Sequence, residues 1–153
     1  MNTRSSFATH AVAPLDRLLP ALAAAIAAAG VLIHLGAILG GPAWFVFFGA
    51  PPAVVRSAEA GTWLAPVSTL LIAAAMGLCG LYAASALGWL RRLPLLRAGL
   101  AAMATVCLLR ALVLVPLAWR HPALLNTFEV TAALVWGLAG LGLAQSFRLA
   151  SKT

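Results

Sequence analysis

The sequence predicts an all-α integral membrane protein: a bundle of four antiparallel transmembrane helices, with a short interfacial helix and loop between the first two. Two observations of composition support this fold class. Hydrophobic residues make up 63% of the 153 residues and charged residues only 8%, and the mean hydropathy is +1.03. A soluble domain carries about 25% charged residues. The third observation is that four apolar stretches are long enough to cross a bilayer, so we expect one membrane domain over residues 1–153.

The net positive charge of the chain also fits an integral membrane protein. Ten Lys and Arg against three Asp and Glu give a net charge of +7. Basic residues flank membrane spans and set their orientation, and the sequence has neither a long basic run nor a nucleic-acid-binding signature. We therefore expect the lipid bilayer, and no nucleic acid, as a partner. Cys79 and Cys107 lie singly in apolar stretches, so we expect no metal, redox motif or cofactor.

The first span is predicted at residues 17–40, behind a cytoplasmic tail of residues 1–16. A cleaved signal peptide is the alternative, but the polar leader is long and the apolar run has full spanning length. Pro20 falls in the first turn, where a missing N–H is tolerated. His34 lies on a stripe of small residues with Gly30, and such stripes let helices approach closely in lipid. His34 is therefore expected to face the bundle.

Residues 41–62 are too interrupted by Gly and Pro to cross a membrane. We expect an extracytoplasmic loop over the outer end of the bundle, with a short helix at 53–60 in which Arg56 and Glu59 are neighbours. Aromatic side chains prefer the membrane interface. The predicted interfacial anchors, here and at the ends of the spans, are Trp44, Phe45, Phe47, Phe48, Trp63 and Trp119.

Three further spans follow the loop. Pro94 interrupts the basic turn at 91–97, and Thr127 is a candidate N-cap with Glu129 in the first helical turn behind it. Small residues recur on the first, second and fourth spans, and those expected to pack helices are Gly30, Gly77, Gly80, Gly137 and Gly140. The predicted spans are residues 63–90, 98–119 and 128–147, followed by a cytoplasmic tail at 148–153.

Charge distribution predicts the orientation. The two tails, the 91–97 turn and Arg17 at the start of the first span together provide seven basic residues, whereas the other two loops hold Arg56 and Arg120. Because basic residues are retained on the cytoplasmic side, both termini are expected in the cytoplasm of a bacterium, with the chain in its inner membrane.

Arg110 lies deep in the third span, where an arginine costs roughly 2.5–3.5 kcal/mol on insertion scales and normally faces protein or trapped water. His34, Thr69 and Glu129 belong to the same outer half of the membrane, and each lies on a small-residue stripe. We therefore expect a polar pocket in the outer half, capped by the aromatic loop. Its candidate ligand-binding residues are Arg110, His34, Glu129, Thr69 and Glu59.

Each of these residues also has a structural interpretation. Arg110 can hold the bundle together by pairing with Glu129 or with backbone carbonyls, or it can extend towards the lipid interface. The axial offset between Arg110 and Glu129, roughly 10 Å, requires a tilted helix, a long side chain or water to bridge it. His34 can be an interhelical hydrogen bonder, Glu129 an acid that favours the start of a helix, and Glu59 a solvated partner of Arg56.

Several reaction classes lack their motifs. The sequence contains no GxSxG, HExxH, Walker A motif or paired intramembrane carboxylates, so we expect no catalytic residues and lean against an enzyme. Small multidrug transporters are similar in length but are built around an acid in the first span. Four-helix enzymes related to vitamin K epoxide reductase require a CxxC that is missing here.

Residues 34 to 117 resemble a set of small four-helix bacterial inner-membrane proteins of uncharacterised function. The matching features are His34, the GGPAWFVFFGA loop, Glu59, the LPLLR turn and Arg110, together with Tyr82 and Ser85. The resemblance implies that the aromatic loop and the intramembrane arginine belong to one common design, and it implies no activity.

Two functions remain open. The first is a non-enzymatic accessory or interaction component that docks lipid, a second copy or a larger membrane complex. The alternative is a binding or transport protein for a small polar or anionic molecule, or for a lipid headgroup, that enters at Arg110.

Overall fold

The computed structural model describes residues 14–122, 125 and 127–151, and in this part of the chain it contains helices and turns without strands. The tails predicted at 1–16 and 148–153 therefore lie partly outside the described residues. Four helical stretches are long and apolar enough to cross a membrane, which confirms the helical class and the number of candidate spans. They are α1 (Pro14–Gly40), α4 (Leu64–Ala86), α5 (Leu96–Leu112) continued by α6 (Leu114–Arg120), and α7 (Thr127–Ala150).

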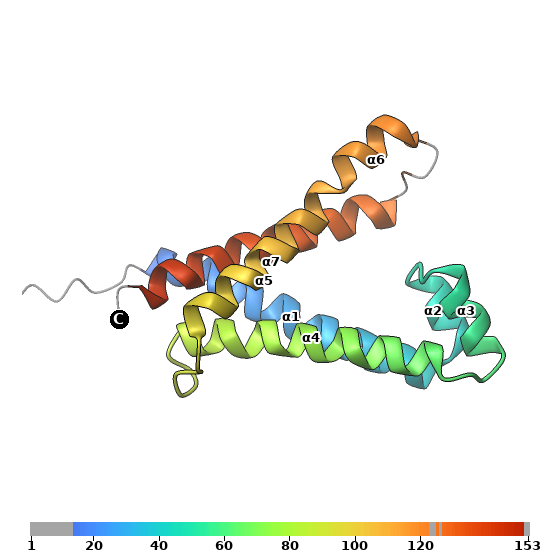
Figure 1. The fold of residues 1–153 in the computed structure, drawn as a ribbon, viewed down its shortest axis with the longest axis horizontal. Helices are drawn as coiled ribbons and strands as arrows, with labels where there is room; N and C mark the ends of the chain where they lie inside the picture. Colours follow the sequence, from blue (N-terminus) through green and yellow to red (C-terminus); the bar gives the residue numbers. More distant parts are fainter. Residues whose placement is uncertain (1–13, 123–124, 126, 152–153) are drawn as a thin grey trace, which may run out of the picture.

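The long helices lie as two pairs that diverge, and they do not close into a compact four-helix bundle (Figure 1). One pair is α1 with α4, and the other is α5 with α7. Within the first pair Gly30 faces Met76 and Gly80 faces Ala27. Residue numbers rise on α1 as they fall on α4, so these two helices run antiparallel.

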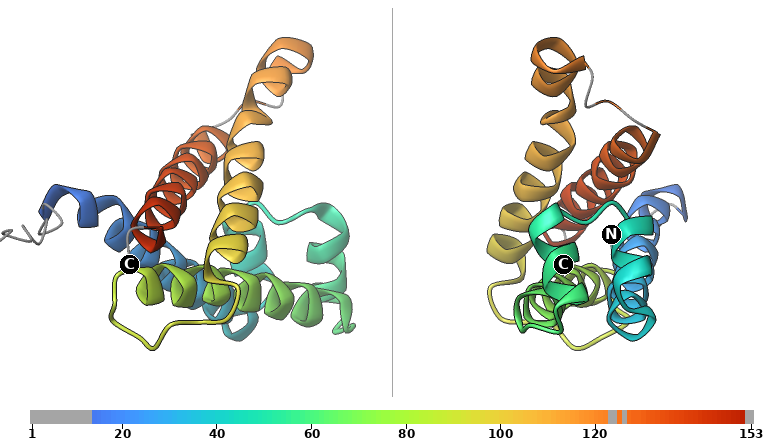
Figure 2. Two further views of the ribbon diagram at one scale, coloured as in Figure 1. Left: turned by 60° about the vertical axis from the view of Figure 1, so that its left-hand side comes forward. Right: turned by 90° about the vertical axis from the view of Figure 1, so that its right-hand side faces the viewer.

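The second pair is antiparallel by the same criterion. Gly140 of α7 faces Leu108 of α5, and Gly137 faces Ala111. The two pairs meet near one end of the molecule and separate towards the other, where α6 and the short helices lie (Figures 1 and 2).

The pairs meet where α7 crosses α1, and the backbones approach closely there. A Cβ atom added to Gly142 of α7 would collide with the carbonyl oxygen of Leu19 and with Ala23 of α1. Only glycine permits this crossing distance. The main buried cluster surrounds it: Leu100 and Leu143 are fully buried, beside small residues such as Ala83.

Helix α4 ends at Ala86, four residues before the predicted end of the second span. Gly88 has a φ of +78°, which glycine adopts without strain. Its N–H donates to the carbonyl of Ser85 (3.1 Å), and the N–H of Trp89 donates to Ala84 (3.0 Å). This pair of bonds is the Schellman motif, which closes a helix by satisfying its last carbonyls.

The third span, predicted as a helix at 98–119, is one helical stretch with an interruption at Val113, whose backbone keeps helical angles. Helix α5 ends at Leu112, and α6 begins at Leu114. Pro116 explains the position of the break, because a proline lacks the N–H that would bond four residues back and its ring clashes with that carbonyl, here the carbonyl of Leu112.

Two short helices connect α1 to α4, and each begins with proline in its first turn, α2 (Pro42–Phe47) and α3 (Pro52–Glu59). Helix α3 matches the helix predicted at 53–60, whereas α2 forms within a segment predicted as loop. We call residues 41–63 the aromatic end. We call residues 87–97 together with 147–151 the basic end, which lies at the opposite end of the molecule in Figure 1.

Candidate functional site

The ion pair within the described residues joins Arg110 to Glu129. Arg110 lies in the last turn of α5, and Glu129 lies in the first turn of α7. The Nη2 atom of Arg110 donates to Oε2 of Glu129 at 3.4 Å, and the two side chains are 39% and 28% exposed. The Glu129 side chain also lies at the positive end of the α7 dipole, a favourable position for an acidic residue. The predicted cation therefore has a protein partner.

The helix register shows how this pair spans its offset. Gly137 faces Ala111 and Gly140 faces Leu108, so the Arg110 backbone lies level with about residue 138 of α7. Glu129 is then nine residues nearer the end of the pair, about 13 Å along the axis at 1.5 Å per residue. Two extended side chains cover most of that distance. The Arg110 side chain thus extends along the helix axis from its own Cα towards the level of Glu129, as a snorkelling side chain does.

The position of Glu129 is set by where α7 begins. The helix begins at Thr127, so Thr127 is its first helical residue, and the neighbouring Asn126 is outside the described residues. The Thr131 hydroxyl donates to the Thr127 carbonyl at 2.7 Å. The prediction of an acid in the first turn is confirmed.

His34 and Thr69 lie on the other helix pair, and each is bonded within its own helix. His34 Nδ1–H donates to the Gly30 carbonyl at 2.7 Å, and the side chain is half-buried. Thr69 is buried, and its hydroxyl donates to the Ala65 carbonyl at 2.7 Å. Among the described residues, no bond joins either side chain to Arg110.

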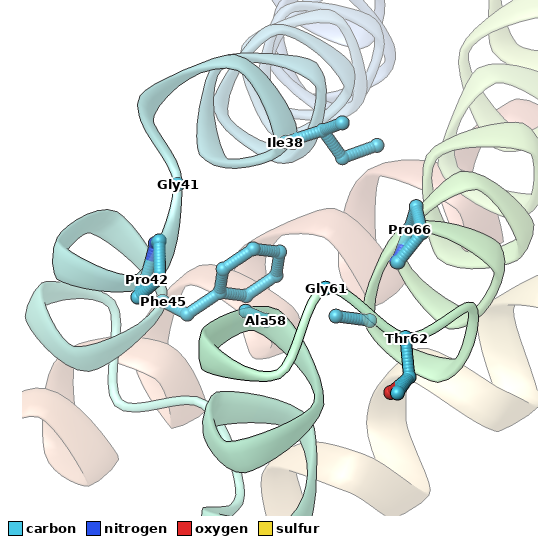
Figure 3. A pocket seen from close by; sticks show the side chains of 9 residues that line it. Ile38, Gly41, Pro42, Phe45, Ala58, Gly61, Thr62 and Pro66 are labelled. Atoms are coloured by element: carbon cyan, nitrogen blue, oxygen red, sulfur yellow. The ribbon is translucent and has the colours of Figure 1, made fainter.

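Two hollows of the described structure lie at the aromatic end. One, of about 350 Å³, is lined by Trp44, Phe47 and Phe48. The second, of about 210 Å³, lies between the end of α1, the two short helices and the start of α4, with the Phe45 ring and Pro66 on its walls (Figure 3). Neither is lined by the five predicted pocket residues, and of those five the structure joins Arg110 to Glu129.

The aromatic side chains divide into one inward residue and several outward ones. Phe45 is buried with Ala37 and Ala65, where it fastens α2 to α1 and α4. Trp44 and Phe47 are exposed, and the Phe47 ring meets the Phe48 ring edge-on at 5.0 Å. Trp63 and Trp119, the other predicted anchors, are also exposed. Phe45 therefore packs the core, whereas the rest can reach an interface.

Glu59 ends α3 on the exposed surface of the aromatic end, where Arg56 is also exposed. Its neighbour Ser57 is buried and carries the bonds of this segment. The Ser57 hydroxyl lies 2.7 Å from the Thr62 hydroxyl and accepts the N–H of Ala65 at 2.9 Å. Ser57 thus satisfies an N–H at the start of α4 that the helix itself leaves unpaired. An isolated serine in a loop gave no signal of this role.

The basic end is fastened by hydrogen bonds that sequence reasoning also missed. The Ser85 hydroxyl donates to the Arg91 carbonyl and accepts the Leu93 N–H, each at 3.1 Å. Tyr82 donates to the Pro94 carbonyl at 3.2 Å. The Arg92 guanidinium donates to the Ala150 carbonyl in the last turn of α7 at 3.1 Å. A cation at a helix C-terminus is favoured by the dipole.

The predicted packing glycines lie at helix contacts inside the monomer. Gly30, Gly77 and Gly80 face the partner helix of the α1–α4 pair, and Gly137 and Gly140 face α5. Gly142, which was not predicted, lies against the backbone of α1 where the two pairs cross. Groups of three or more His, Cys, Asp and Glu suited to a metal ion are not found among the described residues.

Comparison with known proteins gives no match: no family model, curated protein or solved structure is significantly similar to this chain.

Proposed function

We propose that this chain is a four-span protein of the bacterial inner membrane that acts without catalysis, as an accessory or interaction component. In this proposal both termini lie in the cytoplasm, because four basic residues of the described chain gather at the basic end, and cytoplasmic loops retain basic residues. These residues are Arg91, Arg92, Arg97 and Arg148.

One observation supports the non-catalytic role above all others. The polar side chains that could carry chemistry in the spans are bonded to neighbours within the protein. Arg110 pairs with Glu129, while His34 and Thr69 bond their own helices. The outer surface of the spans is apolar, with exposed side chains such as Leu32 and Leu134. Lipid covers such a surface unless another protein does.

The aromatic end is the surface where we expect a partner. Trp44 and Phe47 are 46% and 79% exposed, and they lie beside the 350 Å³ hollow. Exposed aromatic side chains around a cavity are the anchors that protein interfaces favour.

Site-specific photocrosslinking in living cells tests this function. A photoreactive residue at Phe47 is expected to give a protein adduct of defined size, either a second copy or another membrane protein. The same residue at Leu32, which is 70% exposed on α1, serves as the control and is expected to give lipid adducts. If both positions give only lipid adducts, the interaction role is wrong.

A second function is favoured by the geometry of Arg110. Its side chain is 39% exposed, and the bond to Glu129 engages one of five guanidinium N–H groups. The remaining donors suit a small anion or a lipid headgroup. In this alternative the anion competes with Glu129, so Glu129→Gln should tighten binding of inorganic phosphate in calorimetric titration, whereas Arg110→Gln should abolish it. Equal binding by both variants would exclude the alternative.

A further inference from the structure

Three arginines from different segments lie at the basic end. Arg91 belongs to the turn after α4, Arg97 to the first turn of α5, and Arg148 to the last turn of α7; all three are exposed. The Arg97 guanidinium lies 5.0 Å from the centre of the Phe147 ring, so it is held against α7 beside Arg148. Figures 1 and 2 show the turn and the end of α7 at the same end of the molecule. We call Arg91, Arg97 and Arg148 the basic patch.

The turn that carries this patch is held in one conformation. Ser85 bonds both the Arg91 carbonyl and the Leu93 N–H, and Tyr82 donates to the Pro94 carbonyl. Arg92 connects the turn to Ala150 of α7. The backbones of the patch are therefore fixed relative to one another before any ligand arrives, which lowers the entropic cost of binding.

Apolar side chains project from the same turn. Trp89 is 61% exposed and Leu95 is 80% exposed. Leu95 also has a φ of +52°, a left-handed conformation that is unfavourable for leucine. An exposed leucine side chain has no favourable interaction with water. Contact with lipid acyl chains would bury its apolar surface. A tryptophan beside it prefers the level of lipid headgroups.

The acidic side chains of the described chain leave the patch positive. Glu59 lies at the aromatic end and Glu129 at the start of α7, far along the helices from the basic end. The third described acid, Asp16, lies in the first turn of α1. A cationic surface with apolar side chains at its edge matches a ligand that has an anionic head and a hydrocarbon body.

We propose that the basic patch is a binding site for an anionic phospholipid of the cytoplasmic leaflet, such as phosphatidylglycerol. Its phosphate is held by Arg91, Arg97 and Arg148, and its acyl chains lie against Trp89 and Leu95. The inference rests on the proposed insertion of the protein in the membrane. Clusters of arginine next to a transmembrane helix are the recognised signature of anionic lipid binding.

Native mass spectrometry of the detergent-purified full chain tests the site. Phosphatidylglycerol is expected to remain bound where phosphatidylcholine at the same concentration does not. Each arginine near an anionic surface contributes about a fivefold factor, so the R91Q/R148Q variant should bind phosphatidylglycerol at least tenfold more weakly. The matched control R56Q/R120Q removes the same charge from exposed positions elsewhere and should bind like the parent chain.

Further arms identify the ligand. Glycerophosphoglycerol, the headgroup without acyl chains, should not bind measurably, and Leu95→Ser should weaken lipid binding while keeping the arginines. Binding of the bare headgroup or of polyglutamate as strongly as the lipid would indicate a site for soluble anions and overturn the proposal, as would equal losses in the two double variants. If the chain is absent from the membrane fraction, the proposed function fails; if it is present but binds both lipids equally, only this inference fails.

Discussion

At the scale of single residues, Arg110 shows how a charged side chain in an apolar helix finds a partner. The helix register places the Arg110 backbone about 13 Å from the level of Glu129, yet the side chains meet at 3.4 Å. The long Arg110 side chain therefore extends towards the end of the helix pair. There it pairs with Glu129, whose position at the start of α7 is favourable for an acid. A lysine could reach a similar level but would offer a point charge instead of a fork of donors.

The ion pair should be visible as coupling between the two residues. Arg110→Leu and Glu129→Leu each leave one charge without its partner, so each should lower the midpoint of thermal unfolding in mild detergent. The double variant should lose less than the sum of the single losses, by about 1 kcal/mol for a partly exposed pair. A double-mutant cycle on thermal unfolding measures this coupling, and strictly additive losses would show that the contact contributes nothing.

The sequence identified both partners of this pair but not their contact. Arg110 stood out because charged residues are rare inside apolar spans, and Glu129 because acids favour helix starts. Whether they meet depends on the register between α5 and α7, which Gly137 and Gly140 fix by packing against α5. Ser57 and Ser85 were missed for a related reason: their bonds reach backbone groups that only the fold brings near.

At the scale of elements, glycines decide how closely the helices approach, and they are not equivalent. At Gly142 an added methyl group meets the Leu19 carbonyl oxygen of α1, a backbone atom that cannot move aside. At Gly137 the nearest atom is the Ala111 Cβ at 3.7 Å, an ordinary van der Waals contact. The spacing of small residues predicts Gly137 as packing surface but not Gly142, because the role of Gly142 depends on where α7 crosses α1.

These two glycines form a matched pair for mutation. Gly142→Ala should push α7 away from α1 and lower stability by about 1–3 kcal/mol, as overpacked sites do. Gly137→Ala should be neutral or raise stability by up to about 1 kcal/mol, because alanine is the better helix former. Thermal unfolding of the two variants in the same detergent makes the comparison. Equal destabilisation would mean that the crossing of α1 and α7 is not where we describe it.

The contact between α4 and α5 can be tested through its cysteines. Cys79 of α4 packs against the buried cluster that contains Cys107 of α5. Oxidation with copper phenanthroline should therefore join them in a disulfide. Trypsin cuts the exposed basic turn between the two residues, so the fragments that contain Cys79 and Cys107 should migrate together without reductant and separately with it.

In the Cys107→Ser variant, the fragments that contain residues 79 and 107 should migrate separately both with and without reductant. This control shows that trypsin has cut the turn completely. If the parent chain also separates without reductant, α4 and α5 do not pack through these residues.

At the scale of the whole molecule, the two helix pairs share one end and part at the other. The main buried cluster lies where the pairs meet, with Ala23 of α1 and Leu143 of α7 both nearly fully buried. The second cluster, around Phe45, fastens the short helices to the ends of α1 and α4. Interior packing is therefore strongest at the basic end and on the α1–α4 pair.

The orientation that we propose for the whole molecule is based on its charges and can be measured. Reporter domains that fluoresce only in the cytoplasm should be active when fused after residue 153 or inserted in the turn at 91–97. The same reporter inserted at 60–62 or after residue 122 should be inactive, because these loops carry few basic residues. Activity at positions on both predicted sides would contradict a single orientation with four crossings.

The sequence by itself determined the helical class, the number of candidate spans and the end of the molecule that carries the positive charge. These features follow from hydropathy, from Gly and Pro breaks and from charge counts, which are all local properties of the chain. The tertiary structure alone decided that the helices form two diverging pairs, that Arg110 reaches Glu129 and that Gly142 lies at the crossing. Those features depend on the relative register and angle of helices distant in sequence, and small apolar residues allow many such arrangements until all contacts form together.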